Sequence, residues 1–176
     1  MKTDLKFKST PTDKAPDPEL GTKRIPVDRY TEQKYISLED ERLWSKSWLL
    51  AGVESDVREP GSYFVFENLK ESFLITRAVD GQLRAFYNVC QHRGNRLKGI
   101  GCGHANQITC GFHKWSWNLD GSLRYVPEAG DFPQGTPQSE LGLPSVRCDT
   151  WGGFVWISMD PDIEPLEQYL DVIPKH

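Results

Sequence analysis

The chain has 176 residues and a mass of 20.1 kDa, a size that suits one domain with or without an appended arm. Its formal net charge of −4 and isoelectric point near 5.6 argue against a nucleic-acid-binding protein. The longest apolar runs, such as 48–51, are far too short to span a bilayer. We therefore expect neither a nucleic-acid partner nor a membrane partner.

The first 24 residues contain Pro11, Pro16 and Pro18 among charged and small polar residues. This composition buries too little apolar surface to order itself, so we expect a flexible arm over 1–24; an arm that lies along a partner surface is the alternative. The start lacks the apolar core and paired arginines of a signal sequence, which predicts a cytoplasmic protein. In that reducing compartment the four cysteines are expected to be metal ligands or free thiols rather than disulfides.

Residues 25–176 are expected to form one ordered domain that begins with a short helix. Ser37 is a typical helix N-cap, and acidic residues follow it in the first turn, which predicts a helix over about 38–47. The spacing of the apolar residues predicts that the helix is amphipathic; these residues are Leu38, Leu43, Trp44, Trp48 and Leu50. A first strand is expected from Trp48 to Val53.

From residue 61 onward the pattern changes to the two-residue period of β-strands. Strands are predicted over 61–67, 72–79, 82–87, 115–119, 122–126, 145–148 and 154–157. Hairpin turns are predicted at Asp80-Gly81, at Asp120-Gly121 and around Trp151-Gly152-Gly153. A proline-containing loop is expected over 127–144, and one or two helical turns over 164–170. Because strands and helices do not alternate, the fold is predicted to be mainly antiparallel β.

Two short arms carry a thiol and an imidazole each: Cys90-Gln-His92 and Cys110-Gly-Phe-His113, with seventeen residues between His92 and Cys110. They can form a two-sulfur, two-nitrogen metal site only if the fold brings two loops together. Structural zinc takes the same ligands, but common zinc modules pair the two cysteines in one arm and the two histidines in the other. Mixed arms suit a binuclear centre in which two thiolates bind one iron and two imidazoles bind the other. That is the ligand set of a Rieske [2Fe–2S] centre.

The sequence around both arms resembles the Rieske motif of the α subunits of aromatic ring-hydroxylating oxygenases. The resemblance rests on Cys90-x-His92-Arg93-Gly94 and Cys110-x-x-His113-x-Trp115, with matching flanks at 85–90, 119–121 and 151–156, and it covers about residues 27–172. It implies the Rieske iron–sulfur fold, in which small stacked antiparallel sheets hold the cluster between two loop tips. It also implies that Cys90 and Cys110 bind the inner iron and that His92 and His113 bind the outer iron.

Four residues flank these ligands and are expected to surround the cluster: Arg93, Gly94, Lys114 and Trp115. The second arm departs from the family pattern, because Gly111-Phe112 replaces the usual Pro-Tyr and Lys114 replaces the usual glycine. Neither departure alters a ligand. The missing tyrosine hydroxyl leaves open whether packing and hydrogen bonding near the cluster match those of the family.

The reduction potential is expected to be low. Rieske proteins of respiratory complexes carry an extra cysteine in each arm and a serine after the second, and the corresponding positions here are Asn95, Phe112 and Trp115. A disulfide between the arms therefore cannot form, and the serine's hydrogen bond to sulfide is missing. Hydrogen bonds to sulfur raise the potential, so we predict a value near the low end of the Rieske range, about −150 mV.

The segment from 90 to 115 is basic and contains no acidic residue; its cations are Arg93, Arg96, Lys98 and Lys114. Nearby positive charges are expected to favour the reduced cluster and to steer an acidic electron donor. A solvated basic loop is the alternative interpretation for the two lysines. Of the remaining cysteines and histidines, we expect Cys102 to be a free loop thiol, Cys148 a small core residue on a strand, His104 an exposed loop residue and His176 the chain terminus.

Oxygenases of this family pass electrons from the Rieske cluster to a mononuclear iron that activates O₂ on an aromatic or related substrate. That iron is held by two histidines and a carboxylate. His104 and His176 lack the required spacing, so the mononuclear Fe(II) is expected only in a catalytic domain outside this chain. The resemblance thus implies the N-terminal, electron-transferring Rieske domain of a ring-hydroxylating dioxygenase or related oxidoreductase, with no catalytic residue of its own.

The expected electron donor is a ferredoxin or a flavin reductase, and the expected acceptor is the catalytic domain or a neighbouring α subunit. Two other functions stay open. A free-standing Rieske ferredoxin would carry out the same electron transfer as a mobile protein, and a zinc-stabilised interaction module would be the non-redox alternative.

Overall fold

The computed structural model describes residues 24–135 and 140–175, which fall into two compact units, one that ends at Tyr35 and one that begins at Ile36. The first unit contains helix α1 (Asp28–Thr31), where the Tyr35 hydroxyl lies 3.2 Å from the Asp28 carboxylate. The arm expected over 1–24 lies outside the described residues except for Arg24, so it stays a prediction, as does the domain expected over 25–176.

Helix α2 (Gln33–Arg42) begins earlier than expected, and Ser37 lies inside it rather than at its N-cap. Gln33 and Lys34 are good helix formers with no helix breaker before Ser37, so the helix extends backwards past the apparent cap. It ends at Arg42, and the rest of the expected span contains a single 3₁₀ turn, Trp44–Lys46.

Only part of the predicted apolar face of this helix is buried. No residue of α2 is buried, and Leu38 and Leu43 remain 41% and 46% exposed. Trp48, just beyond the helix, is buried, and its indole N–H donates to the Glu164 carbonyl oxygen at 2.9 Å. None of the helices in the described residues has the length and apolar character to cross a bilayer.

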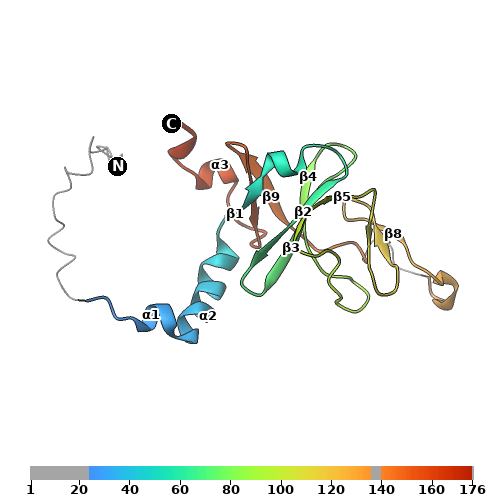
Figure 1. The fold of residues 1–176 in the computed structure, drawn as a ribbon, viewed down its shortest axis with the longest axis horizontal. Coiled ribbons are helices and arrows are strands. Elements are labelled where there is room, and N and C mark those ends of the chain that lie inside the picture. The colour runs from blue at the N-terminus through green and yellow to red at the C-terminus, as the bar shows by residue number, and fades with distance from the viewer. Residues whose placement is uncertain (1–23, 136–139, 176) are drawn as a thin grey trace. The chain divides into compact units, whose positions relative to one another are not determined.

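The second unit is built on two antiparallel sheets, which confirms the predicted fold class (Figure 1). The larger sheet has seven strands in the order β1-β10-β9-β4-β3-β2-β5. Its strands are β1 (Leu49–Val53), β2 (Ser62–Asn68), β3 (Glu71–Arg77), β4 (Leu83–Tyr87), β5 (Gly101–His104), β9 (Ser145–Trp151) and β10 (Phe154–Ser158). The smaller sheet contains β6 (Ile108–Thr109), β7 (Ser116–Trp117) and β8 (Leu123–Tyr125).

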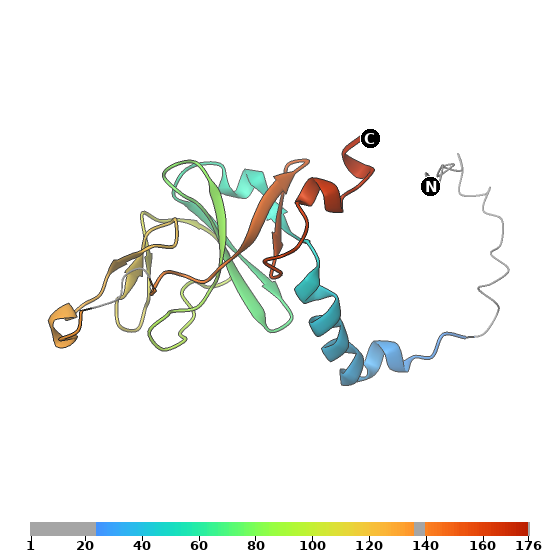
Figure 2. The ribbon, with the colours of Figure 1, turned by 180° about the vertical axis from the view of Figure 1, so that it is seen from behind.

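Short helical turns complete the unit: 3₁₀ turns at Glu54–Val57, Ala129–Asp131 and Ile173–Lys175, and helix α3 (Leu166–Tyr169). Helix α3 confirms the helical turn expected over 164–170. Within the second unit, β8 lies at the end away from α3, and the view from behind shows the same separation (Figures 1 and 2). The small sheet therefore forms one end of the unit, and the second arm lies at this end.

Strand β3 runs through the middle of the core. Its residues from Phe73 to Thr76 have no exposed surface, and successive side chains point to opposite faces of the sheet. Leu74 belongs to a hydrophobic cluster that also contains Cys90 and Cys110. Phe73 and Ile75 belong to a second cluster on the other face. The first cluster is thus the apolar base on which both arms rest.

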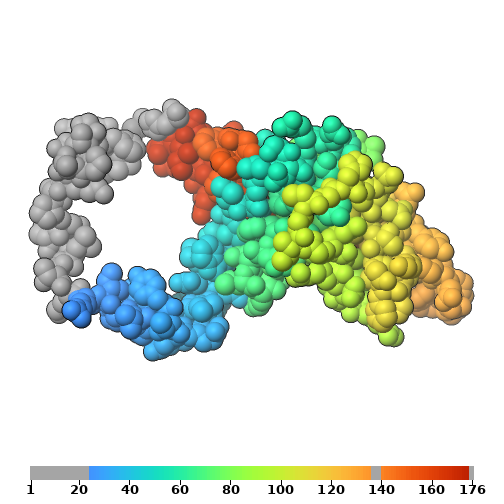
Figure 3. Space-filling model, in the orientation of Figure 1, coloured from blue at the N-terminus to red at the C-terminus, as the bar shows by residue number. Residues whose placement is uncertain are grey.

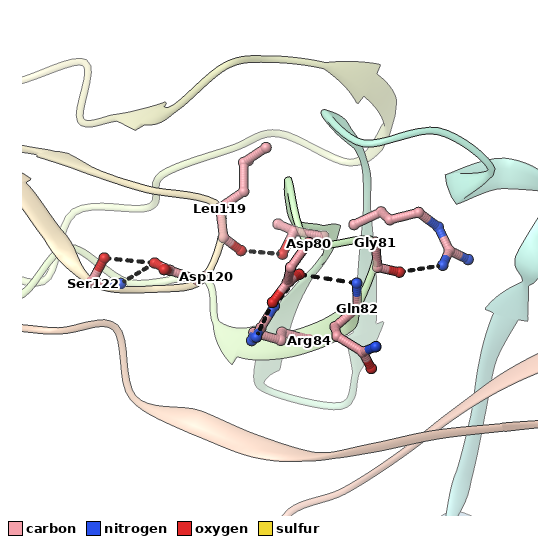
Figure 4. Close-up of polar contacts among 9 residues, drawn as sticks. Asp80, Gly81, Gln82, Arg84, Leu119, Asp120 and Ser122 are labelled. Atoms are coloured by element: carbon pink, nitrogen blue, oxygen red, sulfur yellow. Dashed lines mark hydrogen bonds and ion pairs between the residues drawn. The ribbon is translucent and has the colours of Figure 1, made fainter.

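The predicted Asp-Gly turns are present, with Gly81 at φ +78° and Gly121 at φ +85° (Figure 4). In each turn the aspartate carboxylate accepts a hydrogen bond from the backbone N–H two residues on, at 3.0 Å for Asp80 and 2.9 Å for Asp120. A hydrogen bond also joins β3 to the residue before the second turn: the buried Thr76 hydroxyl donates to the Leu119 carbonyl oxygen at 2.7 Å (Figure 4).

Two strands in the glycine-rich segment between the arms were not predicted. Strand β5 pairs antiparallel with β2 at the edge of the large sheet, and β6 pairs with β7. Residues 101–104 have the sequence Gly-Cys-Gly-His, which has little intrinsic strand preference, so their strand structure depends on backbone pairing with β2. These strands turn what was expected to be a long loop into a return connection between the two arms.

Candidate metal centre

The first arm lies in the loop between β4 and β5, and a buried asparagine clamps this loop at its base. The Asn88 side-chain amide donates to the Lys98 carbonyl oxygen at 2.7 Å and to the Ser72 hydroxyl at 3.1 Å. Its oxygen accepts the Lys98 backbone N–H at 3.0 Å. Sequence reasoning did not identify Asn88, because nothing in its local sequence shows that its side chain bonds to the backbone of a residue ten positions later.

Inside that clamp the first arm forms a tight turn. The Cys90 N–H donates to the Asn95 carbonyl oxygen at 2.8 Å, and the Gly94 N–H donates back to the Cys90 carbonyl oxygen at 2.9 Å. Gly94 has φ +70°, a left-handed conformation that glycine adopts readily because it has no Cβ. The turn directs the segment from Cys90 to His92 towards the second arm.

The second arm repeats this turn between β6 and β7. The Cys110 N–H donates to the Trp115 carbonyl oxygen at 2.8 Å, and the Lys114 N–H donates to the Cys110 carbonyl oxygen at 3.2 Å. Lys114 has φ +63°, so the residue four positions after the cysteine is left-handed in both arms. The two arms are thus equivalent in backbone hydrogen bonding, although one uses glycine where the other uses lysine.

The two thiols lie side by side below the arms. Cys90 and Cys110 are buried in the same hydrophobic cluster, and the Asn95 side-chain amide lies 3.7 Å from the Cys110 sulfur. Burial raises the pKa of Cys90. Burial also acts to raise the pKa of Cys110, but the backbone N–H groups of Phe112 and His113, with Cys90 and Asn95, outweigh it and lower that pKa.

The two imidazoles meet above the thiols. The Nδ1 atoms of His92 and His113 are 3.1 Å apart. The indole of Trp115 stacks on His92, with ring centroids 4.9 Å apart and planes within 4°, and Phe112 stacks on His113 at 3.8 Å. Both rings are half-buried, and burial, with the charges of His113 and Arg93, lowers the pKa of His92. A lowered pKa favours the neutral imidazole, which is the form that binds a metal.

This donor set fits a two-iron cluster better than one metal ion. One pair of sulfurs, from Cys90 and Cys110, and one pair of Nδ1 atoms, from His92 and His113, come from two equivalent turns. The arrangement accordingly matches two irons with unlike ligand pairs.

A cleft of about 420 Å³ opens beside the two histidines. Its near wall is formed by the second arm and its far wall by the loop that follows β8, with Lys114 on one side and Glu128 and Asp131 on the other. Phe132 packs edge-on against Trp115 between them. In the space-filling view, the surface of the segment around 100–125 adjoins that of the loop that begins near 127 (Figure 3). The two acids were not among the predicted site residues, since they are distant in sequence from both arms.

The comparison with protein families agrees with this geometry. The model of the Rieske [2Fe-2S] domain matches residues 47–145, which is more than half of the chain. The chain belongs to the Rieske [2Fe–2S] domain family. A [2Fe–2S] cluster is the cofactor of this family, and binding that cluster for electron transfer is the function that membership assigns to the chain.

Curated relatives of this Rieske domain are oxygenase subunits. The chain is 38% identical to the carnitine monooxygenase oxygenase subunit of Escherichia coli (strain K12) over 83% of its own length and 39% of the relative's. It is 34% identical to the chlorobenzene dioxygenase subunit alpha of Cupriavidus sp. (strain PS12) over 80% of its own length and 31% of the relative's.

A solved structure shows the same fold. The apo form of the quaternary ammonium Rieske monooxygenase CntA superposes with a TM-score of 0.80 at 33% identity, covering 86% of this chain and 44% of that one. The Rieske domain described here therefore spans less than half the length of the oxygenase subunits it matches, and it corresponds to their N-terminal domain.

The expected basic character of the arms holds for only part of the site. Arg96 pairs with Glu67, and the Lys98 ammonium lies 5.0 Å from the centre of the Tyr63 ring. Arg93 and Lys114 are exposed close to the histidines. The surface of this Rieske domain near the imidazoles is thus of mixed charge, with the basic arms facing the acids of the loop after β8.

The remaining cysteines and histidines lie away from the four candidate ligands. Cys102 is an exposed free thiol and His104 is exposed, as expected, but both lie on β5 rather than in a loop. The His104 Nε2 atom is 3.1 Å from the Pro60 carbonyl oxygen. Cys148 lies on β9 against the second hydrophobic cluster, and burial raises its pKa to about 12. His176 lies outside the described residues.

Proposed function

We propose that this Rieske domain is the electron-transferring domain of an oxygenase α subunit and that Cys90, His92, Cys110 and His113 hold its cluster. The observation that carries the proposal is the meeting of the two equivalent turns, with the Nδ1 atoms of the two histidines 3.1 Å apart and both thiols buried in one hydrophobic cluster. In this proposal Cys90 and Cys110 bind the inner iron, and His92 and His113 bind the outer iron. The cluster, when bound, supplies one-electron chemistry.

The protein's own residues contribute burial, orientation and access. Both thiols lie in the first hydrophobic cluster, so the sulfur side of the site is shielded from water. Trp115 and Phe112 stack on the imidazoles and fix their planes. The imidazoles themselves are only half-buried, which leaves the histidine side as the route by which electrons reach a partner. Arg93, Gly94, Lys114 and Trp115 shape and charge this side.

The acceptor in this proposal is a mononuclear Fe(II) in a catalytic domain, either of the same subunit or of a neighbouring one. The lengths of the relatives support it, because the chain covers only 39% of one oxygenase subunit and 31% of another. Among the similar structures, that of CntA has been described in terms of inter-subunit electron transfer. The same relatives favour a domain of an oxygenase over a free-standing ferredoxin.

The donor in this proposal is a ferredoxin or a flavin reductase, and the exposed cations Arg93 and Lys114 support an acidic surface on it. Ring hydroxylation is supported by the likeness to chlorobenzene dioxygenase, whereas the carnitine monooxygenase relative acts on a different class of substrate. A cytoplasmic location is supported by four cysteines of which none is paired in a disulfide.

Anaerobic purification followed by iron and sulfide analysis tests the ligand assignment. We expect about two irons and about two sulfides per chain, with an electron paramagnetic resonance signal after reduction by dithionite. Cys110→Ser should abolish the cluster, while Cys102→Ser, at a thiol outside the site, should keep it. A colourless protein that carries zinc would refute the proposal. The acceptor is tested separately, by searching the reading frame after His176 for a motif of two histidines and one carboxylate.

A further inference from the structure

Four non-glycine residues have positive φ angles in the described part of the chain: Leu69, Lys114, Glu128 and Asp171. This conformation is unfavourable for L-amino acids because Cβ approaches the following carbonyl oxygen. Lys114 directly follows the candidate ligand His113, and both Lys114 and Glu128 line the cleft beside the histidines. Strained residues that persist at a site are candidates for a functional role.

The first arm provides an internal comparison for Lys114. Gly94 occupies the equivalent position, with the same backbone hydrogen bond to the cysteine carbonyl and φ +70° against +63°. A Cβ added at Gly94 would meet no atom within 4 Å. A lack of space is therefore not the reason that the first arm has glycine where the second arm has lysine. Glycine would therefore be the less strained choice at residue 114 as well.

Local packing does not account for the lysine. Lys114 is exposed, and its ammonium makes a 3.3 Å hydrogen bond to the Gly111 carbonyl oxygen in the same arm. An exposed hydrogen bond of this kind exchanges with water and contributes little to stability. None of the ion pairs found among residues 24–135 and 140–175 includes Lys114. What the side chain adds to this position is a positive charge next to the outer-iron ligands.

We propose that Lys114 occupies this strained position for its charge, which stabilises the reduced cluster and so tunes the reduction potential. The inference rests on the proposed function. A [2Fe–2S] cluster with two thiolates and two neutral imidazoles is neutral when oxidised and gains one negative charge when a ferredoxin or flavin reductase donates one electron. A nearby ammonium attracts that charge, and because Lys114 is exposed the attraction is weakened by water and by salt.

Charges on the far wall of the cleft act in the opposite direction. Glu128 and Asp131 are negative and destabilise an added electron. Arg93 does not line the cleft, but its charge acts on His92 and so works in the same direction as Lys114. Glu128 is itself left-handed, with φ +55°. The cleft thus contains two strained residues of opposite charge beside the histidines. Removing the charge of Lys114 should destabilise the reduced cluster, and removing the charge of Glu128 should stabilise it.

Three variants separate charge from backbone strain: Lys114→Met removes the charge and keeps the strain, Lys114→Gly removes both, and Lys114→Arg keeps both. We expect Met and Gly to lower the ratio of reduced to oxidised cluster at a fixed potential about two- to tenfold, where tenfold equals 59 mV for a one-electron couple. Arg should leave the ratio unchanged, Glu128→Gln should raise it, and added salt should shrink every difference. Only Gly should raise the urea midpoint of unfolding.

Titration of the cluster monitored by electron paramagnetic resonance gives these ratios. Unchanged ratios in both Lys114→Met and Lys114→Gly would overturn the inference, and so would a shift in the glycine variant alone, since backbone strain would then be the cause. Either result leaves the ligand assignment intact, because the cluster signal would still be present. Absence of any iron–sulfur signal in the unaltered protein would refute the proposed function itself.

Discussion

The side-chain amide of Asn95, in the first arm, lies 3.7 Å from the sulfur of Cys110, in the second. Asn95 stands where a respiratory-complex Rieske protein is expected to have a disulfide cysteine. The two arms are therefore linked at this position by a hydrogen bond to a ligand sulfur instead of by a covalent bond. This contact has two consequences, one for the potential and one for the Cys110 thiol, whose pKa it helps to lower.

The potential of the unaltered domain should still lie low in the Rieske range, near −150 mV, because the serine and the disulfide are absent. Asn95→Ala should lower it further, since a hydrogen bond to sulfur stabilises the reduced form. Asn118→Ala, which removes a side-chain amide bonded to Ser122 in the β7–β8 turn, is the control and should leave the potential unchanged. A clearly positive value for the unaltered domain, or no shift in Asn95→Ala, would contradict this reasoning.

Thiol reactivity should divide the four cysteines into three classes. Cys102 is exposed and should react with iodoacetamide at neutral pH. Cys148 should not react, because burial holds its pKa at about 12 and little thiolate forms. Cys90 and Cys110 should be protected while the cluster is bound and become reactive only after iron is removed. Peptide mass spectrometry of both forms checks this, and labelling of Cys90 or Cys110 in the loaded protein would argue against their role as ligands.

Thr76→Val should destabilise the domain by about 1–3 kcal/mol, because it leaves the Leu119 carbonyl oxygen without its buried donor. The substitution keeps the shape of a side chain with no exposed surface. Ser45→Ala is a matched control, since its hydroxyl makes an equally short 2.7 Å hydrogen bond to a carbonyl at an exposed position. Urea unfolding measures both variants, and equal losses would show that burial of the Thr76 contact is not what matters.

The turn between β3 and β4 should contribute stability that depends on pH. The Arg84 guanidinium, followed by the Gln82 backbone N–H, lowers the pKa of Asp80 from 3.8 to about 2. Because the folded pKa is the lower one, the stabilisation is fully present above about pH 4 and is lost as pH falls towards about 2.

Asp80→Asn should therefore unfold at lower urea concentration than the unaltered domain at neutral pH, and the gap should close over that acidic range. Arg84→Met removes the partner of the same pair and should show the same convergence. A gap of constant size across the range would mean that the carboxylate is not the source of the stability.

Much of the fold was predictable because its determinants are local. The Asp-Gly pairs at 80–81 and 120–121 place a glycine where φ is positive and an aspartate where its carboxylate accepts the following N–H. The four candidate ligands were predicted for the same reason, since each arm carries its own short motif. Strand β5 was missed because its residues have little strand preference and only the pairing partner β2 makes them a strand.

What could not be predicted depends on contacts between distant segments. Glu128 and Asp131 lie beside the histidines only because the loop after β8 folds back over the second arm. Asn88 and Asn95 give no local signal of the bonds they make to Lys98 and Cys110. The left-handed angle of Lys114 becomes evident only when its turn is compared with the turn that contains Gly94.

The central claim is that two imidazoles and two thiolates hold one two-iron cluster. Hyperfine spectroscopy of the reduced protein, with histidine labelled with ¹⁵N, tests it most directly. We predict strong couplings to two imidazole nitrogens, and Cys102→Ser should show the same two couplings. A reduced cluster with no strongly coupled histidine nitrogen would contradict the account, because all of its ligands would then be other than His92 and His113.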